Sequence, residues 1–349
     1  MILKRQLTVC IAAATVAALV LTGCASGSRA SNPPRSAENL SGTITVYNAQ
    51  HEELTQAWVD EFTEQTGVQV TLRNGGDSDL GNQLVAEGSA SPADVFLSEN
   101  SPAMSLVDNA SLFAALSQAT LDQVPARYRP SSGNWTGIAA RSTVFVYNPS
   151  MLTEGELPAS IMDLADPEWK GKWAASPSGA DFQAIVSAML EIEGETATLR
   201  WLRAMKSNSV AYKGNSTVMK AVNAGEIPGG IIYHYYWFGD QAGTGENTGN
   251  AALHYFKNQD PGAFVSVSGG GVLKTSKNPA AAAAFVKFIT SKNGQTILRT
   301  GGSFEYPVRT DVAANTALVP LSTLDAPELD PATLNSKTVS DLLTRAGLL

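Results

Sequence analysis

Cysteine and histidine, which supply many metal and nucleophilic sites, are scarce in this sequence. Its 349 residues include two cysteines and three histidines. Both cysteines, Cys10 and Cys24, stand close to the N-terminus, so the rest of the chain has no thiol for a disulfide, a metal site or a catalytic nucleophile. The sequence also offers too few ligands for a typical zinc site, because such sites use several histidine or cysteine residues.

Sequence motifs of common enzyme classes are missing as well. There is no Gly-x-Ser-x-Gly motif of a serine hydrolase, no phosphate-binding P-loop, and no Gly-x-Gly-x-x-Gly after a strand. His51-Glu52 begins a zinc-peptidase motif, but Thr55 stands where the second histidine is needed. We therefore expect a protein that is not an enzyme. An extracytoplasmic lipoprotein hydrolase that uses Glu99 as acid or base is the weaker alternative.

Charge and composition narrow the class further. The chain has 24 basic and 32 acidic residues, a formal net charge of -8, and a nucleic-acid-binding protein would instead show a basic face. Hydrophobic residues make up 44% of the chain and charged residues 16%, which is typical of a folded globular protein. The length suits two domains.

The first residues have the pattern of a targeting segment. Lys4 and Arg5 precede an apolar run from 7 to 21, which is too short to span a membrane comfortably. Its end, Leu21-Thr22-Gly23-Cys24, resembles the lipobox of bacterial lipoproteins. We expect residues 1–23 to be a lipoprotein signal peptide, Cys24 to carry the lipid, and residues 24–42 to be a flexible linker on the extracytoplasmic face of the membrane.

The folded part reads as an α/β protein. Residues 43–47 and 68–72 have strand patterns and enclose an amphipathic helix over 52–65, so the chain opens as a βαβ unit with parallel strands. Ligands of open α/β sheets lie at the carboxyl ends of strands. His51 follows the first strand and Glu99 follows another over 93–98, which makes both candidate ligand residues.

Further segments add three expectations. Asp79 is a candidate N-cap for a helix through Glu87. Small residues over 176–180 precede a helical run over 182–190, which suits either an anion-binding helix start or an ordinary cap. The triple glycine 269–271 follows a strand over 263–267, and it suits either a hinge or a point of tight packing.

The most distinctive stretch of the sequence runs from Gly230 to Trp237. It places Tyr233, Tyr235 and Tyr236 within four positions, and such clusters serve either as packing or as a binding site. With His51 and Glu99, the last two tyrosines form a set of oxygen and imidazole donors that suits a hard ion such as Fe(III). Consecutive strand residues face opposite sides, so we expect these two tyrosines in a loop or first helical turn after a strand.

The whole chain from residue 43 onward resembles the periplasmic ferric-ion-binding proteins of ABC transporters. The landmarks that carry this resemblance are Val46-Tyr47-Asn48, Gln50-His51, Ser91-Pro92-Ala93-Asp94-Val95-Phe96, Ser98-Glu99, Pro167, Trp169-Lys170, Ser178-Gly179-Ala180, Tyr235-Tyr236-Trp237, Asp260-Pro261-Gly262-Ala263 and Glu305-Tyr306-Pro307. The resemblance implies a type 2 periplasmic-binding fold, in which each lobe is a mixed sheet flanked by helices and two strands form the hinge. We expect lobe 1 over 43–142 and 268–313, and lobe 2 over 143–267 and 314–349.

The resemblance also implies a complete site. Fe(III) would bind His51, Glu99, Tyr235 and Tyr236, and a synergistic phosphate or carbonate would bind Ser178, Gly179, Ala180 and Asn215. Two positions depart from the family pattern, Tyr233 and Asn100, and together with Arg141 they are candidates to alter the anion's contacts. His234 is expected to support the site rather than bind the metal.

The expected partner is an ABC permease that receives the iron from a monomeric, lipid-anchored binding protein, without nucleic acid. The nearest alternative is a binding protein of the same fold for an organic cation, a thiamine-like compound or a phosphonate, because aromatic residues also cage cations. The sequence leaves open the affinity, the anion, the permease, and whether the cargo is bare Fe(III) or a chelate.

Overall fold

The computed structural model describes residues 40–349 of the chain. The expected signal peptide, Cys24 and most of the expected linker lie outside the described residues. Within the described range, no helix combines the length and apolar character needed to cross a membrane.

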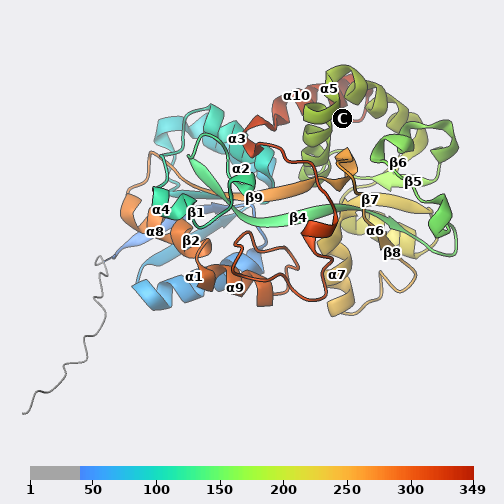
Figure 1. Ribbon diagram of the computed structural model, residues 1–349. Coiled ribbons are helices and arrows are strands. Elements are labelled where there is room, and N and C mark those ends of the chain that lie inside the picture. The colour runs from blue at the N-terminus through green and yellow to red at the C-terminus, as the bar shows by residue number, and fades with distance from the viewer. Residues whose placement is uncertain (1–39) are drawn as a thin grey trace, which may run out of the picture. The chain divides into compact units, whose positions relative to one another are not determined.

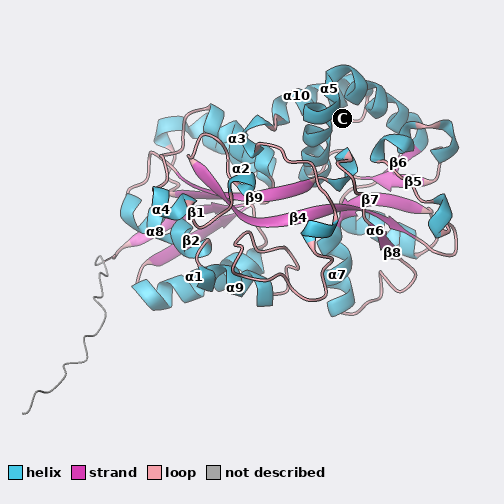
Figure 2. Ribbon diagram, viewed as in Figure 1, coloured by secondary structure: helices cyan, strands magenta, loops and turns pink. Residues whose placement is uncertain are grey.

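The described chain is a mixed α/β structure (Figure 2). Its strands are β1 (Thr43–Asn48), β2 (Gln69–Asn74), β3 (Val95–Ser98), β4 (Trp135–Tyr147), β5 (Trp173–Ala175), β6 (Ser209–Ala211), β7 (Gly229–Tyr233), β8 (Ala252–His254) and β9 (Val265–Val272). Its α-helices are α1 (Glu52–Thr66), α2 (Asp77–Glu87), α3 (Ser101–Asn109), α4 (Gln118–Leu121), α5 (Ala180–Asn208), α6 (Asn215–Asn223), α7 (His234–Ala242), α8 (Pro279–Ile289), α9 (Lys292–Thr300) and α10 (Ser336–Ala346).

Two long strands, β4 and β9, run between two groups of helices (Figure 1). The strands follow one another in the order β2-β1-β3-β9-β4-β7-β5-β6, and β8 also pairs with β4. We call β1–β3 with α1–α3, α8 and α9 the first lobe, and β5–β8 with α5–α7 and α10 the second lobe. The two-lobed fold and its two-strand connection are therefore as expected, while the residue boundaries of the lobes stay a prediction.

Alternation along the strands explains how each lobe is covered on both faces. In β1, Val46 packs with residues of α1 and α8, whereas Tyr47 packs with residues of α2 and α3. In β4, Phe145 packs with residues of α5 and α10, whereas Val146 packs with residues of α6. Since neighbouring strand residues face opposite sides, one apolar strand serves both helical layers.

Most predicted segments are confirmed, including the parallel β1–β2 pair. One helix start was wrong: α2 begins at Asp77, and its N-cap is Gly76 rather than Asp79. Asp77 instead directs its carboxylate to the backbone N–H of Glu99, at 2.8 Å. The helical run beginning at 182 continues through α5, which is interrupted at Gly194, where φ is 79° and ψ is 167°.

The triple glycine lies inside β9 and is hydrogen-bonded on both sides. Gly269, Gly270 and Gly271 pair with β3 and with β4. A Cβ on Gly271 would stand 2.6 Å from the Phe113 ring, and one on Gly269 would stand 2.3 Å from Met104. Of the two expectations for these glycines, the structure supports tight packing.

Replacement of Gly271 by alanine is therefore expected to destabilise the fold by about 1–3 kcal/mol, because a buried ring would have to move. The urea midpoint of unfolding measures this loss. Gly155→Ala is the matched control, since an added Cβ there meets no heavy atom within 4 Å. Equal midpoints for the two variants would contradict the packing role.

Candidate metal site

Two of the expected ligands come from the carboxyl ends of neighbouring parallel strands. His51 follows β1 and Glu99 follows β3, and these strands pair in parallel. The His51 side chain makes no capping hydrogen bond to α1. Its Nε2 lies 3.2 Å from Oε1 of Glu99 and has no hydrogen-bond partner among the described residues. A buried ring nitrogen without a partner beside a carboxylate is suited to hold a further ligand.

The two tyrosines come from the second lobe, in the first turn of α7. This helix begins at His234, directly after β7, so the expectation that Tyr235 and Tyr236 leave strand geometry is confirmed. The helical turn allows their rings to stack, with centroids 4.4 Å apart. The Tyr235 hydroxyl donates to Oε1 of Glu99 at 2.6 Å, which connects the two lobes.

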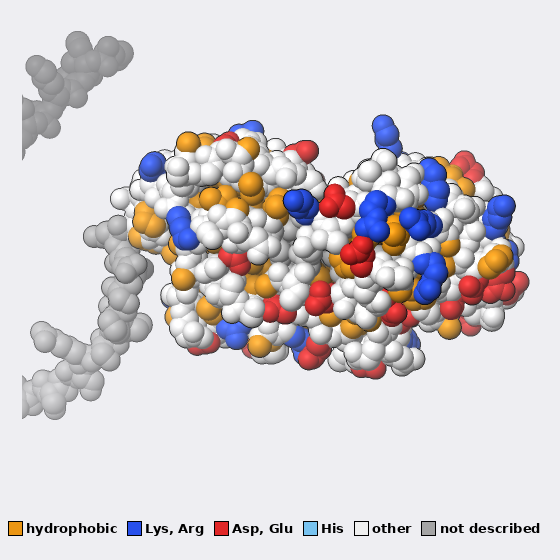
Figure 3. Space-filling view, turned by 90° about the horizontal axis from the view of Figure 1, so that it is seen from above, with side chains coloured by type: hydrophobic (Ala, Val, Ile, Leu, Met, Phe, Trp, Pro, Cys, Tyr) orange, Lys and Arg blue, Asp and Glu red, His pale blue; other side chains and the backbone are white. Residues whose placement is uncertain are grey.

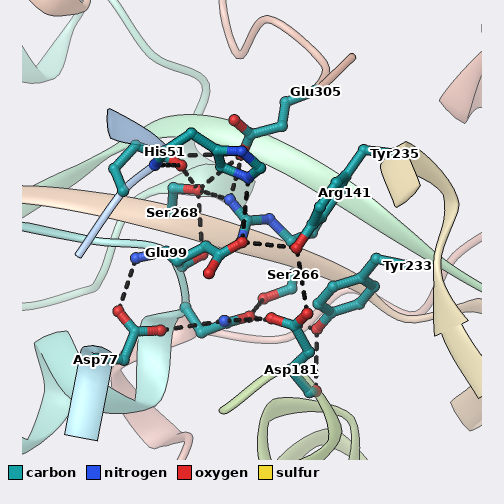
Figure 4. Close-up of polar contacts among 12 residues, drawn as sticks. His51, Asp77, Glu99, Arg141, Asp181, Tyr233, Tyr235, Ser266, Ser268 and Glu305 are labelled. Carbon is teal, nitrogen blue, oxygen red and sulfur yellow. Dashed lines mark hydrogen bonds and ion pairs between the residues drawn. The ribbon is translucent and has the colours of Figure 1, made fainter. Parts of the chain in front are cut away.

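Asp181 joins these residues and was missed in the sequence. It is the second residue of α5 and is buried. Its Oδ2 accepts a hydrogen bond from Tyr236 at 3.1 Å and lies 3.2 Å from the Tyr235 hydroxyl oxygen. Figure 4 shows its carboxylate directed toward Tyr235. The only sequence signal was an acidic residue in a first helical turn, which does not tell where the side chain points.

An amide connects Asp181 with a second buried acid. The Asn100 side chain donates to Asp181 Oδ1 at 2.8 Å and to Asp77 Oδ2 at 3.1 Å. Burial, together with the negative charge of Glu99, raises the pKa values of Asp77 and Asp181. Burial acts on Glu99 in the same direction, but the Arg141 charge and the His51 contact outweigh it and lower the pKa of Glu99. Of the carboxylates of Asp77, Asp181 and Glu99, that of Glu99 is therefore the most firmly ionised.

Arg141 lies behind Glu99 in the middle of β4 and is fully buried. One guanidinium nitrogen lies 3.0 Å from Glu99 Oε1, and the other contacts Glu305 and Ser268. The candidate Arg141 thus touches an expected metal ligand. Glu305, also fully buried, was noted in the sequence as a landmark and not as a site residue.

The four expected anion-binding residues do not all face the same space. Ser178 and Ala180 line a cavity of about 510 Å³, together with Asp77 and Asn100. On the face shown in Figure 3 the surface is hollowed between the lobes. Asn215, in contrast, donates its side-chain amide to Asp181 Oδ2 at 2.7 Å. Its amide is therefore already engaged by a carboxylate of the protein.

Tyr233 and His234 support the site from within the fold. The Tyr233 hydroxyl lies 3.4 Å from Asn100 Oδ1 and from the carbonyl oxygen of Asp181. The Ser142 N–H donates to His234 Nδ1 at 3.2 Å, and His234 Nε2 lies 2.8 Å from the Phe304 carbonyl oxygen. Burial lowers the pKa of His234 to about 3. With both ring nitrogens engaged, His234 positions the start of α7 and has no free nitrogen for a metal.

The tyrosine hydroxyls are held in their protonated form. Burial, followed by the negative charges of Asp181 and Glu99, raises the pKa values of Tyr235 and Tyr236. Only a strongly charged cation can displace such protons and bind the phenolates. Across residues 40–349, no group of three or more histidine, cysteine, aspartate or glutamate side chains is placed to hold a metal.

Comparisons with known proteins show the family of this chain. A model of the bacterial extracellular solute-binding protein family matches residues 90–332. The chain is 69% identical over 306 residues to the "Fe(3+)-binding periplasmic protein" of Serratia marcescens, covering 88% of this chain and 90% of that protein. It is 37% identical over 308 residues to the "Major ferric iron-binding protein" of Neisseria meningitidis serogroup B, covering 87% and 93%.

A solved structure shows the same likeness in three dimensions. The crystal structure of iron-bound HitA from Pseudomonas aeruginosa superposes with a TM-score of 0.82 at 40% identity, covering 88% of this chain and 99% of that one. The chain belongs to the bacterial extracellular solute-binding proteins. Within that family its relatives are ferric-iron-binding proteins of the periplasm, which confirms the resemblance stated from the sequence.

Proposed function

We propose that this protein captures Fe(III) between its two lobes and delivers it to the permease of an ABC importer. The observation that carries the proposal is the convergence of Tyr235 and Tyr236 on Glu99 and Asp181, with His51 beside Glu99. Phenolate, carboxylate and imidazole donors match a small, highly charged ion. His51, Glu99, Tyr235 and Tyr236 are the proposed ligands.

The alternatives have less support from the site. An organic cation would need exposed ring faces, but one face of Tyr235 stacks on Tyr236 and the Arg141 guanidinium carbon lies 5.5 Å from its ring centroid. The lowered pKa of Glu99 makes it a poor general acid. Membership in a solute-binding family supports a partner permease, and we propose that the binding protein acts as a monomer.

Titration of the iron-free protein with Fe(III) should produce a coloured complex with one iron per chain, because phenolates transfer charge to Fe(III). Tyr235→Phe and Tyr236→Phe should each weaken binding by more than the roughly 10- to 100-fold cost of losing an outer-shell contact. Visible absorbance measures both effects. Tyr147→Phe, at the far end of β4, is the control and should leave the colour unchanged. A wild-type protein that stays colourless would refute the proposal.

The source of the remaining negative charge is a separate proposal. The resemblance implies a phosphate or carbonate on Ser178, Gly179, Ala180 and Asn215. Asn215 and both metal tyrosines already contact the Asp181 carboxylate, and this supports Asp181 as the anionic group in place of an exogenous one. The exogenous anion stays the alternative.

Iron affinity should therefore change less than about threefold when phosphate or carbonate is added to anion-free buffer. Asp181→Asn should weaken Fe(III) binding at least about tenfold, because a carboxylate is lost while the shape is kept. Competition with a coloured chelator measures the affinity in each buffer. Iron binding by the wild type that requires phosphate or carbonate would instead favour the exogenous anion.

We also propose that Cys24 is lipidated and holds the protein on the extracytoplasmic face of the membrane, because it ends the lipobox-like stretch. The full-length protein should partition into the detergent phase of Triton X-114, and Cys24→Ser should move it into the aqueous phase. Cys10→Ser is the matched control and should partition like the wild type. An unmodified Cys24 in the mass spectrum of the processed protein would contradict the lipid anchor.

A further inference from the structure

A buried ion pair of opposite charges lies directly behind the proposed iron ligands. Arg141 and Glu305 both have no solvent exposure, and the guanidinium contacts the Glu305 carboxylate. Burying such a pair costs several kcal/mol per ion, and apolar residues of similar volume often stabilise a fold as well or better. The pair is therefore poorly explained by stability alone, and its place at the site points to an electrostatic role.

The two charges stand differently toward Glu99, the proposed ligand that Arg141 contacts. Arg141 lies 3.0 Å from Glu99 Oε1, and its guanidinium carbon lies 5.5 Å from the Tyr235 ring centroid. Glu305 lies on the other side of the guanidinium, where its Oε1 accepts from Gln50 and Ser268, both at 3.3 Å. Figure 4 shows Arg141 between the two carboxylates. The positive end of the pair thus faces Glu99 and Tyr235.

We propose that the Arg141–Glu305 pair sets how strongly the site prefers trivalent over divalent cations. A nearby positive charge opposes a bound cation in proportion to that cation's charge, so Arg141 weakens Fe(III) binding more than Fe(II) binding. The midpoint potential of the one-electron couple, Fe(III) + e⁻ → Fe(II), is then higher than it would be without Arg141. Glu305 carries the opposite charge and acts in the opposite direction.

The inference rests on the proposed function, because it concerns the iron that the site binds. It goes beyond that function by giving a role to two residues that are not ligands. The guanidinium stays charged at all accessible pH values, so the effect is permanent and not a pH switch. The raised midpoint potential would make bound Fe(III) easier to reduce by a one-electron donor.

The test is the midpoint potential of bound iron, measured by spectroelectrochemistry at the phenolate charge-transfer band. Arg141→Gln should lower the midpoint potential. The shift should correspond to a rise of at least about tenfold in the ratio of Fe(III) affinity to Fe(II) affinity. Glu305→Gln should raise it, and Arg141→Lys, which keeps the charge, should stay near the wild type. The double variant Arg141→Gln with Glu305→Gln should return toward the wild-type potential.

A merely structural role predicts a different pattern. If only shape matters, the potential of Arg141→Lys shifts as much as that of Arg141→Gln, or the potentials of Arg141→Gln and Glu305→Gln shift in the same direction. Either result would overturn the inference. If Arg141→Gln does not fold, Glu305→Gln and the double variant still decide, because they must lie above and close to the wild type, respectively. A colourless wild type would refute the proposed function itself, whereas coloured variants with unchanged potentials would refute only this inference.

Discussion

One carboxylate oxygen, Oε1 of Glu99, holds the site together. Three groups from different parts of the chain reach it: the ring of His51, the guanidinium of Arg141 and the hydroxyl of Tyr235. The first comes from the first lobe, the second from a connecting strand and the third from the second lobe. The charge-assisted contacts of Arg141 and Tyr235 with this oxygen are strong. The position of each lobe at the site therefore depends on this atom.

The rest of the fold serves to keep that oxygen in contact with groups from both lobes. The parallel strands β1 and β3 end side by side and so present His51 and Glu99 at one edge. The change from β7 to α7 places two consecutive tyrosines on one side, which a strand could not do. The Gly269–Gly271 backbone lets β9 pack against Phe113 and Met104, close to the end of β3. The same few strands thus pack the apolar side chains and position the polar ones.

Much of this could be predicted from the sequence, and the limits have physical reasons. Period-two strands, the helix over 52–65 and the adjacent tyrosines are local patterns, so the α/β class and the four candidate ligands followed from them. Asp181, Asp77 and Glu305 were missed because ordinary acidic residues become functional only through burial and long-range partners. Asn100 contacts Asp181, 81 residues away, and no local pattern records such a distance. The helix start at Asp77 was missed for the same reason, since the Asp77 carboxylate accepts a hydrogen bond from the distant backbone N–H of Glu99.

His234 directly precedes Tyr235 and Tyr236, two of the proposed iron ligands, and yet its own ring is held by contacts within the fold. Its ring joins β4 to the segment around Phe304 and stacks on Tyr306. Neighbouring positions are thus constrained for different reasons: Tyr235 and Tyr236 by their proposed contact with the cargo, and His234 by its contacts within the fold. Variation that altered the cargo could proceed through His51, whose side chain makes no capping hydrogen bond to α1, while leaving His234 alone.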